Sequence, residues 1–91
     1  MTYSVWISHA ARRHLRALHP DLRNAVIHAA LALAGDPRPP GAKQLKGELR
    51  GVWRLRVGDY RASYLIDDVA RVVRLSRVGH RSTFYKRLKG E

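Results

Sequence analysis

The sequence predicts a single α+β domain over residues 1–91, in which a strand and a helical hairpin precede an antiparallel meander of three strands. Three observations lead to this fold: an alternating apolar run near the N-terminus, helical periodicity in the next thirty or so residues, and three further strand-like runs separated by turn signals. The strands should form one mostly antiparallel sheet, and the helices should cover one of its faces.

The N-terminal part contains the first strand and both helices. The segment TYSVWIS (residues 2–8) alternates apolar and polar side chains, as a half-buried strand does. Ser8 is a typical N-cap residue, and a helix is predicted over residues 9–19. Pro20 ends that helix and can occupy the first turn of the next one, which is predicted over residues 21–35.

The meander follows a Pro/Gly-rich loop at residues 35–42, which is too short to be a domain linker. Gly58-Asp59 is a two-residue hairpin signal with glycine at the first turn position. A second turn is expected at Asp67-Asp68. The three predicted strands are residues 52–57, 60–67 and 69–79.

The predicted hairpin turn determines which side chains face each other in the first two strands of the meander. With Gly58-Asp59 at the turn, Arg56 lies opposite Arg61, and Arg54 lies on the same face. The apolar side chains of both strands fall on the opposite face, which the helices can cover. Directly opposed like charges destabilise a sheet, so stability does not explain the cluster. A phosphate that bridges the guanidinium groups would explain it; arginines that simply extend into solvent are the alternative.

The net charge is +11, and residues 43–91 contribute +8, from thirteen basic and five acidic side chains. This distribution favours a polyanionic partner, nucleic acid or a strongly acidic protein, over a merely solubilising surface. The absence of cysteine excludes disulfides and thiolate metal sites. No apolar run of membrane-spanning length and no secretory signal pattern appear, so a cytoplasmic protein is expected.

The segment after the last predicted strand carries groups that suit RNA chemistry. His80 is the only histidine in residues 43–91, and an imidazole can exchange a proton near neutral pH. Arg81 and Tyr85 follow it closely. The histidines of the N-terminal half lack the spacing of metal ligands, so neither a metal site nor a cofactor is expected.

These motifs resemble a known family. The segments KQLKGELRGVWRLRVGDYRASYLID and RLSRVGHRSTFYKR are similar to the RelE/ParE toxin superfamily, and within it to the RelE branch. The resemblance covers nearly the whole chain and implies a RelE-like fold and a toxin of a type II toxin–antitoxin pair. It further implies an endoribonuclease (mRNA interferase) that cleaves mRNA in the ribosomal A site without a metal. The implied partners are a cognate antitoxin, acidic or amphipathic, together with the ribosome and mRNA.

The resemblance also indicates which residues act. Some family members have lysines where this chain has Arg54 and Arg56, and arginine is a poor general base. The proton donor or acceptor is therefore left open between His80 and Tyr85. Strict alternation places His80 on the arginine face and Arg81 on the other, unless Gly79 allows a bulge. The predicted catalytic residues are Arg61, Arg81, His80 and Tyr85, and the predicted RNA-binding residues are Arg54, Arg56, Lys43, Lys46 and Arg77.

Two other functions stay open. One is a ParE-like poison of DNA gyrase, which would be a binding toxin and no nuclease. The combination of Arg61, Arg81 and Tyr85 argues against it. The other is a plain basic domain that binds RNA or DNA, which accounts for the opposed arginines only through generic phosphate contacts.

Overall fold

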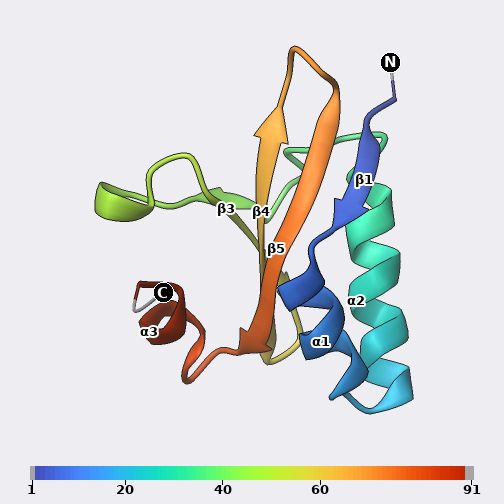
Figure 1. The fold of residues 1–91 in the computed structure, drawn as a ribbon, viewed down its shortest axis with the longest axis vertical. Coiled ribbons are helices and arrows are strands. Elements are labelled where there is room, and N and C mark those ends of the chain that lie inside the picture. The colour runs from blue at the N-terminus through green and yellow to red at the C-terminus, as the bar shows by residue number, and fades with distance from the viewer. Residues whose placement is uncertain (1, 90–91) are drawn as a thin grey trace.

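The computed structural model describes residues 2–89 and shows one five-stranded sheet with helices on both sides (Figure 1). The strand order is β1-β5-β4-β3-β2, with β1 parallel to β5 and all other neighbours antiparallel. The elements are β1 (Ser4–Ile7), α1 (His9–Arg16), α2 (Pro20–Ala32), β2 (Lys43–Gln44), the 3₁₀ helix η1 (Gly47–Leu49), β3 (Trp53–Val57), β4 (Tyr60–Asp67), β5 (Val72–His80) and α3 (Phe84–Lys89).

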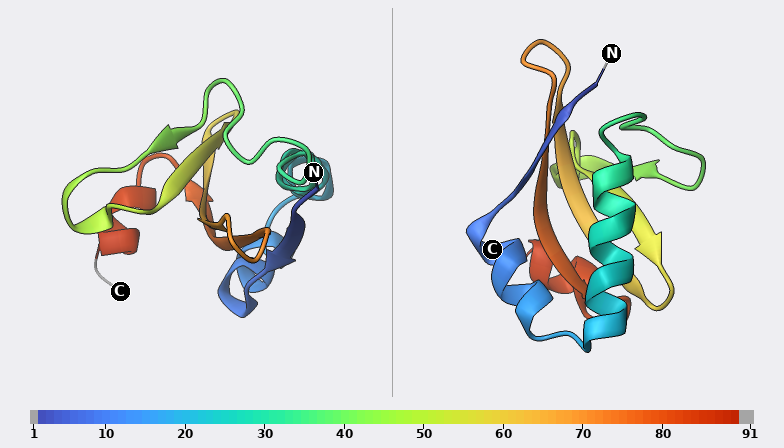
Figure 2. Two further views of the ribbon diagram at one scale, coloured as in Figure 1. Left: turned by 90° about the horizontal axis from the view of Figure 1, so that it is seen from above. Right: turned by 90° about the vertical axis from the view of Figure 1, so that its right-hand side faces the viewer.

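The helical hairpin covers one face of the sheet, as predicted, and the core lies between the two layers (Figure 2). Leu15 of α1 and Val26 of α2 belong to one hydrophobic core with the inward-facing side chains of the meander. Among these, Tyr64 of β4 and Leu75 of β5 are fully buried. Burial of such side chains is the main favourable term in folding. The predicted α+β class is therefore confirmed, although both helices are shorter than predicted.

The β3–β4 hairpin has the predicted register. Val57 pairs with Tyr60 and Arg56 with Arg61. Gly58 has φ +59°, which is the conformation that a tight hairpin turn with glycine in first position requires.

Hydrogen bonds hold the Pro/Gly-rich loop at residues 35–42 against strand β4 and the turn that follows it. The Tyr64 hydroxyl donates to the Pro37 carbonyl at 2.8 Å, and burial raises the pKa of this phenol to about 12. Arg38 donates through both terminal nitrogens to the Asp68 carboxylate, and the Tyr3 hydroxyl donates to it at 2.6 Å. These two donors lower the pKa of Asp68 to about 2.

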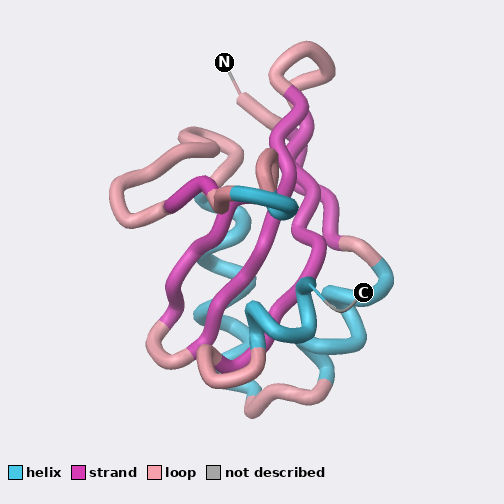
Figure 3. Tube along the Cα trace, turned by 90° about the vertical axis from the view of Figure 1, so that its left-hand side faces the viewer, coloured by secondary structure: helices cyan, strands magenta, loops and turns pink. Residues whose placement is uncertain are grey.

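Three elements of the structure were not predicted, namely the 3₁₀ helix η1, the strand β2 and the helix α3. The two-residue strand β2 extends the sheet beyond β3, and the short helix α3 lies on the face opposite α1 and α2 (Figure 3). Phe84, which is 2% exposed, packs its ring against Gly79 of β5 and so attaches α3 to the sheet. A Cβ atom at position 79 would lie 3.6 Å from the Phe84 ring. The arginine face is thus partly covered by a helix.

A bulge interrupts the pairing of β5 with β4. Tyr64 pairs with Leu75 and Ser63 pairs with Arg77, so Ser76 is the extra, unpaired residue of the bulge in β5. The hydroxyls of Ser63 and Ser76 lie 2.7 Å apart across the bulge. Bulges bend a strand and increase its twist, and this one lies directly after the last residue that pairs with β1.

The bulge corrects the sequence-based assignment of faces after it. Gly79 pairs with Arg61, and His80 pairs with Tyr60 on the side of the apolar face. The prediction that strict alternation puts His80 on the arginine face and Arg81 on the other is wrong, because one extra residue reverses the alternation. The sequence pointed to Gly79 as the place for a bulge, but the irregularity precedes it by three residues.

Helix α1 replaces β1 as the neighbour of β5 after the bulge. The Ser8 hydroxyl caps α1 by accepting from the Ala11 N–H at 3.1 Å, and it donates to the Ser76 carbonyl at 3.0 Å. Further along, the Val78 N–H donates to Nδ1 of His14 at 3.2 Å. Edge groups that would otherwise lack a strand partner are thereby satisfied. Among the described residues, no helix is long and apolar enough to cross a membrane.

Candidate nucleic-acid interface

Five of the predicted site residues line one hollow of about 380 Å³, which we call the arginine hollow. It lies at the end of the sheet where the β3–β4 hairpin meets the segment after β5, so His80 at the end of β5 also lines it, although it pairs with Tyr60 on the apolar side. Among residues 2–89, those that line it include no acidic side chain. These residues are Arg56, Arg61, His80, Arg81, Ser82 and Tyr85.

The arginines of this hollow are positioned by the hairpin turn. Arg61 donates from Nη1 to the carbonyls of Gly58 and Tyr60, at 3.0 and 2.9 Å. The backbone N–H of Arg81 donates to the Asp59 carbonyl at 2.8 Å, and Nε of Arg81 lies 3.6 Å from the Asp59 carboxylate. That ion pair is well exposed to solvent and contributes little stability. The turn thus orients both guanidinium groups toward the hollow and leaves donors for an anion.

The His80 ring is held by the turn that leads into α3. The Ser82 N–H donates to Nδ1 of His80 at 3.1 Å, and the Ser82 hydroxyl lies 2.8 Å from the same nitrogen. The ring also makes an edge-to-face contact with Tyr60, at 5.4 Å between centroids. Because Nδ1 accepts a backbone hydrogen bond, the neutral imidazole carries its proton on Nε2.

A second hollow of about 390 Å³, which we call the lysine hollow, adjoins the first and shares Arg56 and Tyr85 with it. Lys43 of β2 and Lys46 contribute two further cations. Tyr85 is 37% exposed, so its ring is accessible at the boundary between the two hollows. Together they form one basic surface with an aromatic ring in it.

Arg54 in the lysine hollow differs from its neighbours, because it is only 6% exposed. Its Nε and Nη1 atoms are buried without a hydrogen-bond partner. A buried donor without a partner destabilises the folded state, and this is more pronounced for a charged group. An anion bound in the lysine hollow could supply the missing acceptors.

Arg77 is the one predicted RNA-binding residue that lies outside both hollows. It lines a smaller cavity beside β5, together with His14 of α1. His14 and Ser82 were not predicted as site residues, because their roles depend on the path of the chain at the bulge and the final turn. Among residues 2–89, no group of three or more His, Asp or Glu side chains is arranged to hold a metal ion.

Comparison with known proteins gives concordant results. Residues 5–85 match the family model described as the ParE toxin of type II toxin–antitoxin systems, parDE. The chain is 40% identical to toxin RelG of Mycobacterium tuberculosis over 88 residues, which cover 96% of this chain and all of the relative. It is 33% identical to toxin RelE of the same organism, over 92% of this chain and 87% of the relative.

Toxin–antitoxin complexes are also among the solved structures to which this chain is similar. The toxin–antitoxin complex RelBE2 of M. tuberculosis contains a chain that matches with a TM-score of 0.80 and 37% identity, over 88% of this chain and 99% of that one. The archaeal RelE–RelB complex of Pyrococcus horikoshii matches with a TM-score of 0.77 and 25% identity, over 89% and 97% of the two chains.

Proposed function

Since this chain belongs to the RelE/ParE family of toxins of type II toxin–antitoxin systems, we propose that it is an endoribonuclease that cleaves mRNA in the ribosomal A site. The observation that carries the proposal is the concentration of cations in the two adjoining hollows. Arg56 and Arg61 are directly opposed across the hairpin, and the buried guanidinium of Arg54 lacks acceptors. A polyphosphate ligand resolves both features, whereas a neutral ligand does not offset the opposed charges.

The reaction that suits this surface is attack by the ribose 2′-oxygen on the adjacent phosphorus. The new bond joins the 2′-oxygen to phosphorus, and the bond from phosphorus to the 5′-oxygen breaks. The products are a 2′,3′-cyclic phosphate and a 5′-hydroxyl, so one proton leaves the 2′-oxygen and one is added to the 5′-oxygen. Negative charge accumulates on the phosphoryl oxygens in the transition state, where preorganised cations are most effective.

Arg61 and Arg81 are the proposed partners of the reacting phosphate. The hairpin turn already orients both side chains, so little reorganisation accompanies the reaction. Arg56 neutralises charge beside them, and Arg54, Lys43 and Lys46 hold the neighbouring phosphate in the lysine hollow. Arginine keeps its proton throughout, so these residues act as cations and not as bases.

His80 suits the role of a hydrogen-bond donor better than that of a base. Its Nδ1 lone pair is engaged by Ser82, and Nε2 then carries the proton. We assign Nε2 to a phosphate oxygen or the departing 5′-oxygen. Tyr85, accessible at the boundary of the two hollows, provides a ring on which a base can stack. The ribosome would supply the remaining alignment of the 2′-oxygen.

The proposal includes a cognate antitoxin of acidic or amphipathic character, since the similar solved structures are of toxin–antitoxin complexes. An acidic segment would associate rapidly with the +8 half of the chain, at a rate that falls with added salt. Action on ribosomes places the protein in the cytoplasm. The proposed reaction uses no metal, so EDTA at concentrations that leave ribosomes intact should not slow it.

The test is single-turnover cleavage of mRNA on programmed ribosomes, read by primer extension. Arg61→Ala and Arg81→Ala should each reduce the rate roughly 10²–10³-fold, as loss of a preorganised transition-state donor does. Arg74→Ala is the matched control, because it removes the same charge from a position that lines neither hollow. Wild-type rates in both site variants would refute the assignment.

A gyrase poison is the second candidate, and the ParE description of the matching family model favours it. It predicts gyrase-dependent DNA breaks and no cleavage of ribosome-bound mRNA. Assaying the wild-type protein on purified gyrase with plasmid DNA, in parallel with programmed ribosomes, separates the two candidates directly.

A further inference from the structure

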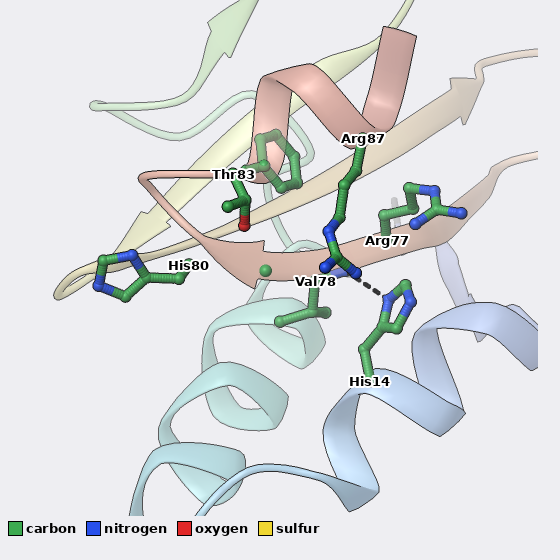
Figure 4. A pocket seen from close by; sticks show the side chains of 8 residues that line it. His14, Arg77, Val78, His80, Thr83 and Arg87 are labelled. Carbon is green, nitrogen blue, oxygen red and sulfur yellow. Dashed lines mark hydrogen bonds between the residues drawn. The ribbon is translucent and has the colours of Figure 1, made fainter. Parts of the chain in front are cut away.

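The outer face of the sheet, opposite α1 and α2, changes its character at the bulge in β5. Beyond the bulge α3 lies over β5, and Arg87 reaches down across that strand (Figure 4). Before the bulge β5 pairs with β1 on one side and with β4 on the other, and most outer side chains of these three strands are exposed. The sheet therefore has an open outer region next to a covered one.

One row of residues in the open region places a cation between two apolar side chains. Trp6 of β1 pairs with Arg74 of β5, which pairs on its other side with Leu65 of β4. Paired residues of neighbouring strands project from the same face of a sheet, so these three side chains are neighbours. That face is the outer one, because Val73 and Leu75 on either side of Arg74 are buried in the core. We call these three residues the outer row.

The apolar members of the outer row are unusually exposed. Trp6 is 60% exposed and Leu65 is 43% exposed. Single exposed apolar side chains are ordinary on a protein surface, whereas adjacent ones mark interaction sites. The surface is hollowed on both sides of Arg74, by a space of about 320 Å³ that borders Leu65 and one of about 340 Å³ that borders Trp6. Each hollow has room for a side chain of a partner.

The cation of the outer row has no counter-charge within the protein. Among the interactions of residues 2–89, none is an ion pair or a hydrogen bond of the Arg74 side chain. Asp67 borders the hollow beside Leu65, but its carboxylate accepts hydrogen bonds from the backbone N–H groups of Val69 and Ala70. Charge complementarity therefore favours a partner that brings a carboxylate to Arg74 and apolar side chains to its two neighbours.

The spacing of the outer row fits an amphipathic helix that lies across the strands. Neighbouring strands are about 4.7–4.9 Å apart, so Trp6 and Leu65, which are two strands apart, are separated by roughly 9.5 Å. A helix rises about 1.5 Å per residue, so its residues i and i+7 lie on one face roughly 10.5 Å apart, with i+3 and i+4 between them. Apolar residues at i and i+7 with Asp or Glu at i+3 or i+4 therefore match the row.

We propose that the outer row is the docking site for an acidic amphipathic helix of this kind in the cognate antitoxin. The inference rests on the part of the proposed function that gives the chain an antitoxin, and similar chains occur in solved toxin–antitoxin complexes. RNA fits less well, because the row offers one cation between two apolar groups and a polyphosphate is bound by several cations. A second copy also fits less well, because an isologous contact centred on the row would bring two Arg74 side chains together.

The experiment measures the affinity of the toxin for its cognate antitoxin by surface plasmon resonance. Trp6→Gln should weaken binding about 30-fold and Leu65→Gln about tenfold, because a few central anchors dominate the energy of an interface. Leu31→Gln is the matched control for Leu65→Gln, since Leu31 is 55% exposed on α2, on the other side of the sheet. Its affinity should stay within about threefold of the wild type.

The charge is tested in the same way. Arg74→Glu should weaken binding at least about tenfold, because it places a like charge against the carboxylate of the partner. Arg13→Glu makes the same change at an exposed position on α1 and should keep the wild-type affinity. The residues of the outer row line neither the arginine hollow nor the lysine hollow, so their variants should cleave mRNA at the wild-type rate when no antitoxin is present.

Fluorine NMR reports directly on what covers Trp6. The chain has two tryptophans, so Trp53→Phe labelled with 5-fluorotryptophan gives one resonance, that of Trp6. Antitoxin should shift this resonance, because the indole becomes buried in the complex. A short oligouridine, or a higher concentration of the toxin alone, should leave it unchanged.

The outcomes separate this inference from the proposed function. If the wild type cleaves mRNA but the three variants of the outer row keep wild-type affinity for the antitoxin, the docking site is refuted and the proposed nuclease stands. Equal losses in the control variants also refute it, and a Trp6 resonance that responds to RNA or to toxin concentration assigns the row to RNA or to a second copy instead. If the antitoxin binds through the outer row but the wild type cleaves no mRNA, the docking site stands and the nuclease fails.

Discussion

Replacing Arg54 by methionine should stabilise the protein while it weakens RNA binding. The side chain is 6% exposed, and its Nε and Nη1 atoms have no hydrogen-bond partner. Methionine has a comparable length, no donors, and enough flexibility to fill the space that the guanidinium leaves. The substitution therefore removes two unsatisfied groups and a buried charge without creating a large cavity.

The size of the effect follows from the number of unsatisfied groups. Each buried unpaired donor costs about 1–3 kcal/mol, and part of the gain is lost through imperfect packing of the new side chain. We expect a net increase in the free energy of unfolding of about 2 kcal/mol. For a chain of this length, about 5 °C of melting temperature corresponds to each kcal/mol, so the midpoint should rise by about 10 °C.

Urea and thermal unfolding, followed by circular dichroism, measure the change. Arg56→Met is the matched control, because Arg56 is exposed and its replacement should alter stability by less than about 0.5 kcal/mol. Added inorganic phosphate should raise the midpoint of the wild type more than that of Arg54→Met, because an anion supplies the missing acceptors. A midpoint for Arg54→Met that falls by several degrees would refute the reasoning.

Three further predictions concern other parts of the molecule. Ser8→Ala should lower stability by about 1–2 kcal/mol in urea unfolding, since the hydroxyl caps α1 and also bonds the bulge carbonyl, whereas Ser8→Thr should retain most of it. Because the folded-state pKa of Asp68 is lowered to about 2, its contribution to stability is complete above about pH 4 and is lost as the pH falls toward 2. Melting temperatures between pH 5 and 2 should therefore decline less steeply in Asp68→Asn. His80→Gln, which keeps a donor, should retain cleavage within about tenfold and leave the pH–rate profile between pH 6 and 8 unchanged; a loss of about 10²–10⁴-fold would show that His80 transfers a proton as acid or base.

The sequence predicted those parts of the fold that depend on local signals. The Gly58-Asp59 turn specifies the hairpin register without reference to anything else in the chain, and β4 has the predicted bounds. Helix α3 was missed because a helix of six residues has no stable helical preference of its own, and the burial of Phe84 against Gly79 decides its conformation.

The bulge is the other limit of the sequence-based prediction. A serine within a β-branched strand gives no indication that it will be unpaired, because the signal lies in its partners, Ser63 and Ser8. The faces of His80 and Arg81 were assigned wrongly for this reason. The catalytic and RNA-binding roles of the arginines, His80 and Tyr85 stay predictions until the variants are measured.

The strand order has a consequence for the synthesis of the protein. β5 lies between β1 and β4 in the sheet, yet it follows both of them in the chain. While a ribosome is still translating residues 72–80, the nascent chain cannot join its first strand to the hairpin, and Arg81 and Tyr85 come later still. Because β1 pairs only with β5 in this sheet, the fold is complete only once that last strand is available. The arginine hollow, which needs Arg81 and Tyr85, is therefore assembled only after β5 has joined the first strand to the hairpin.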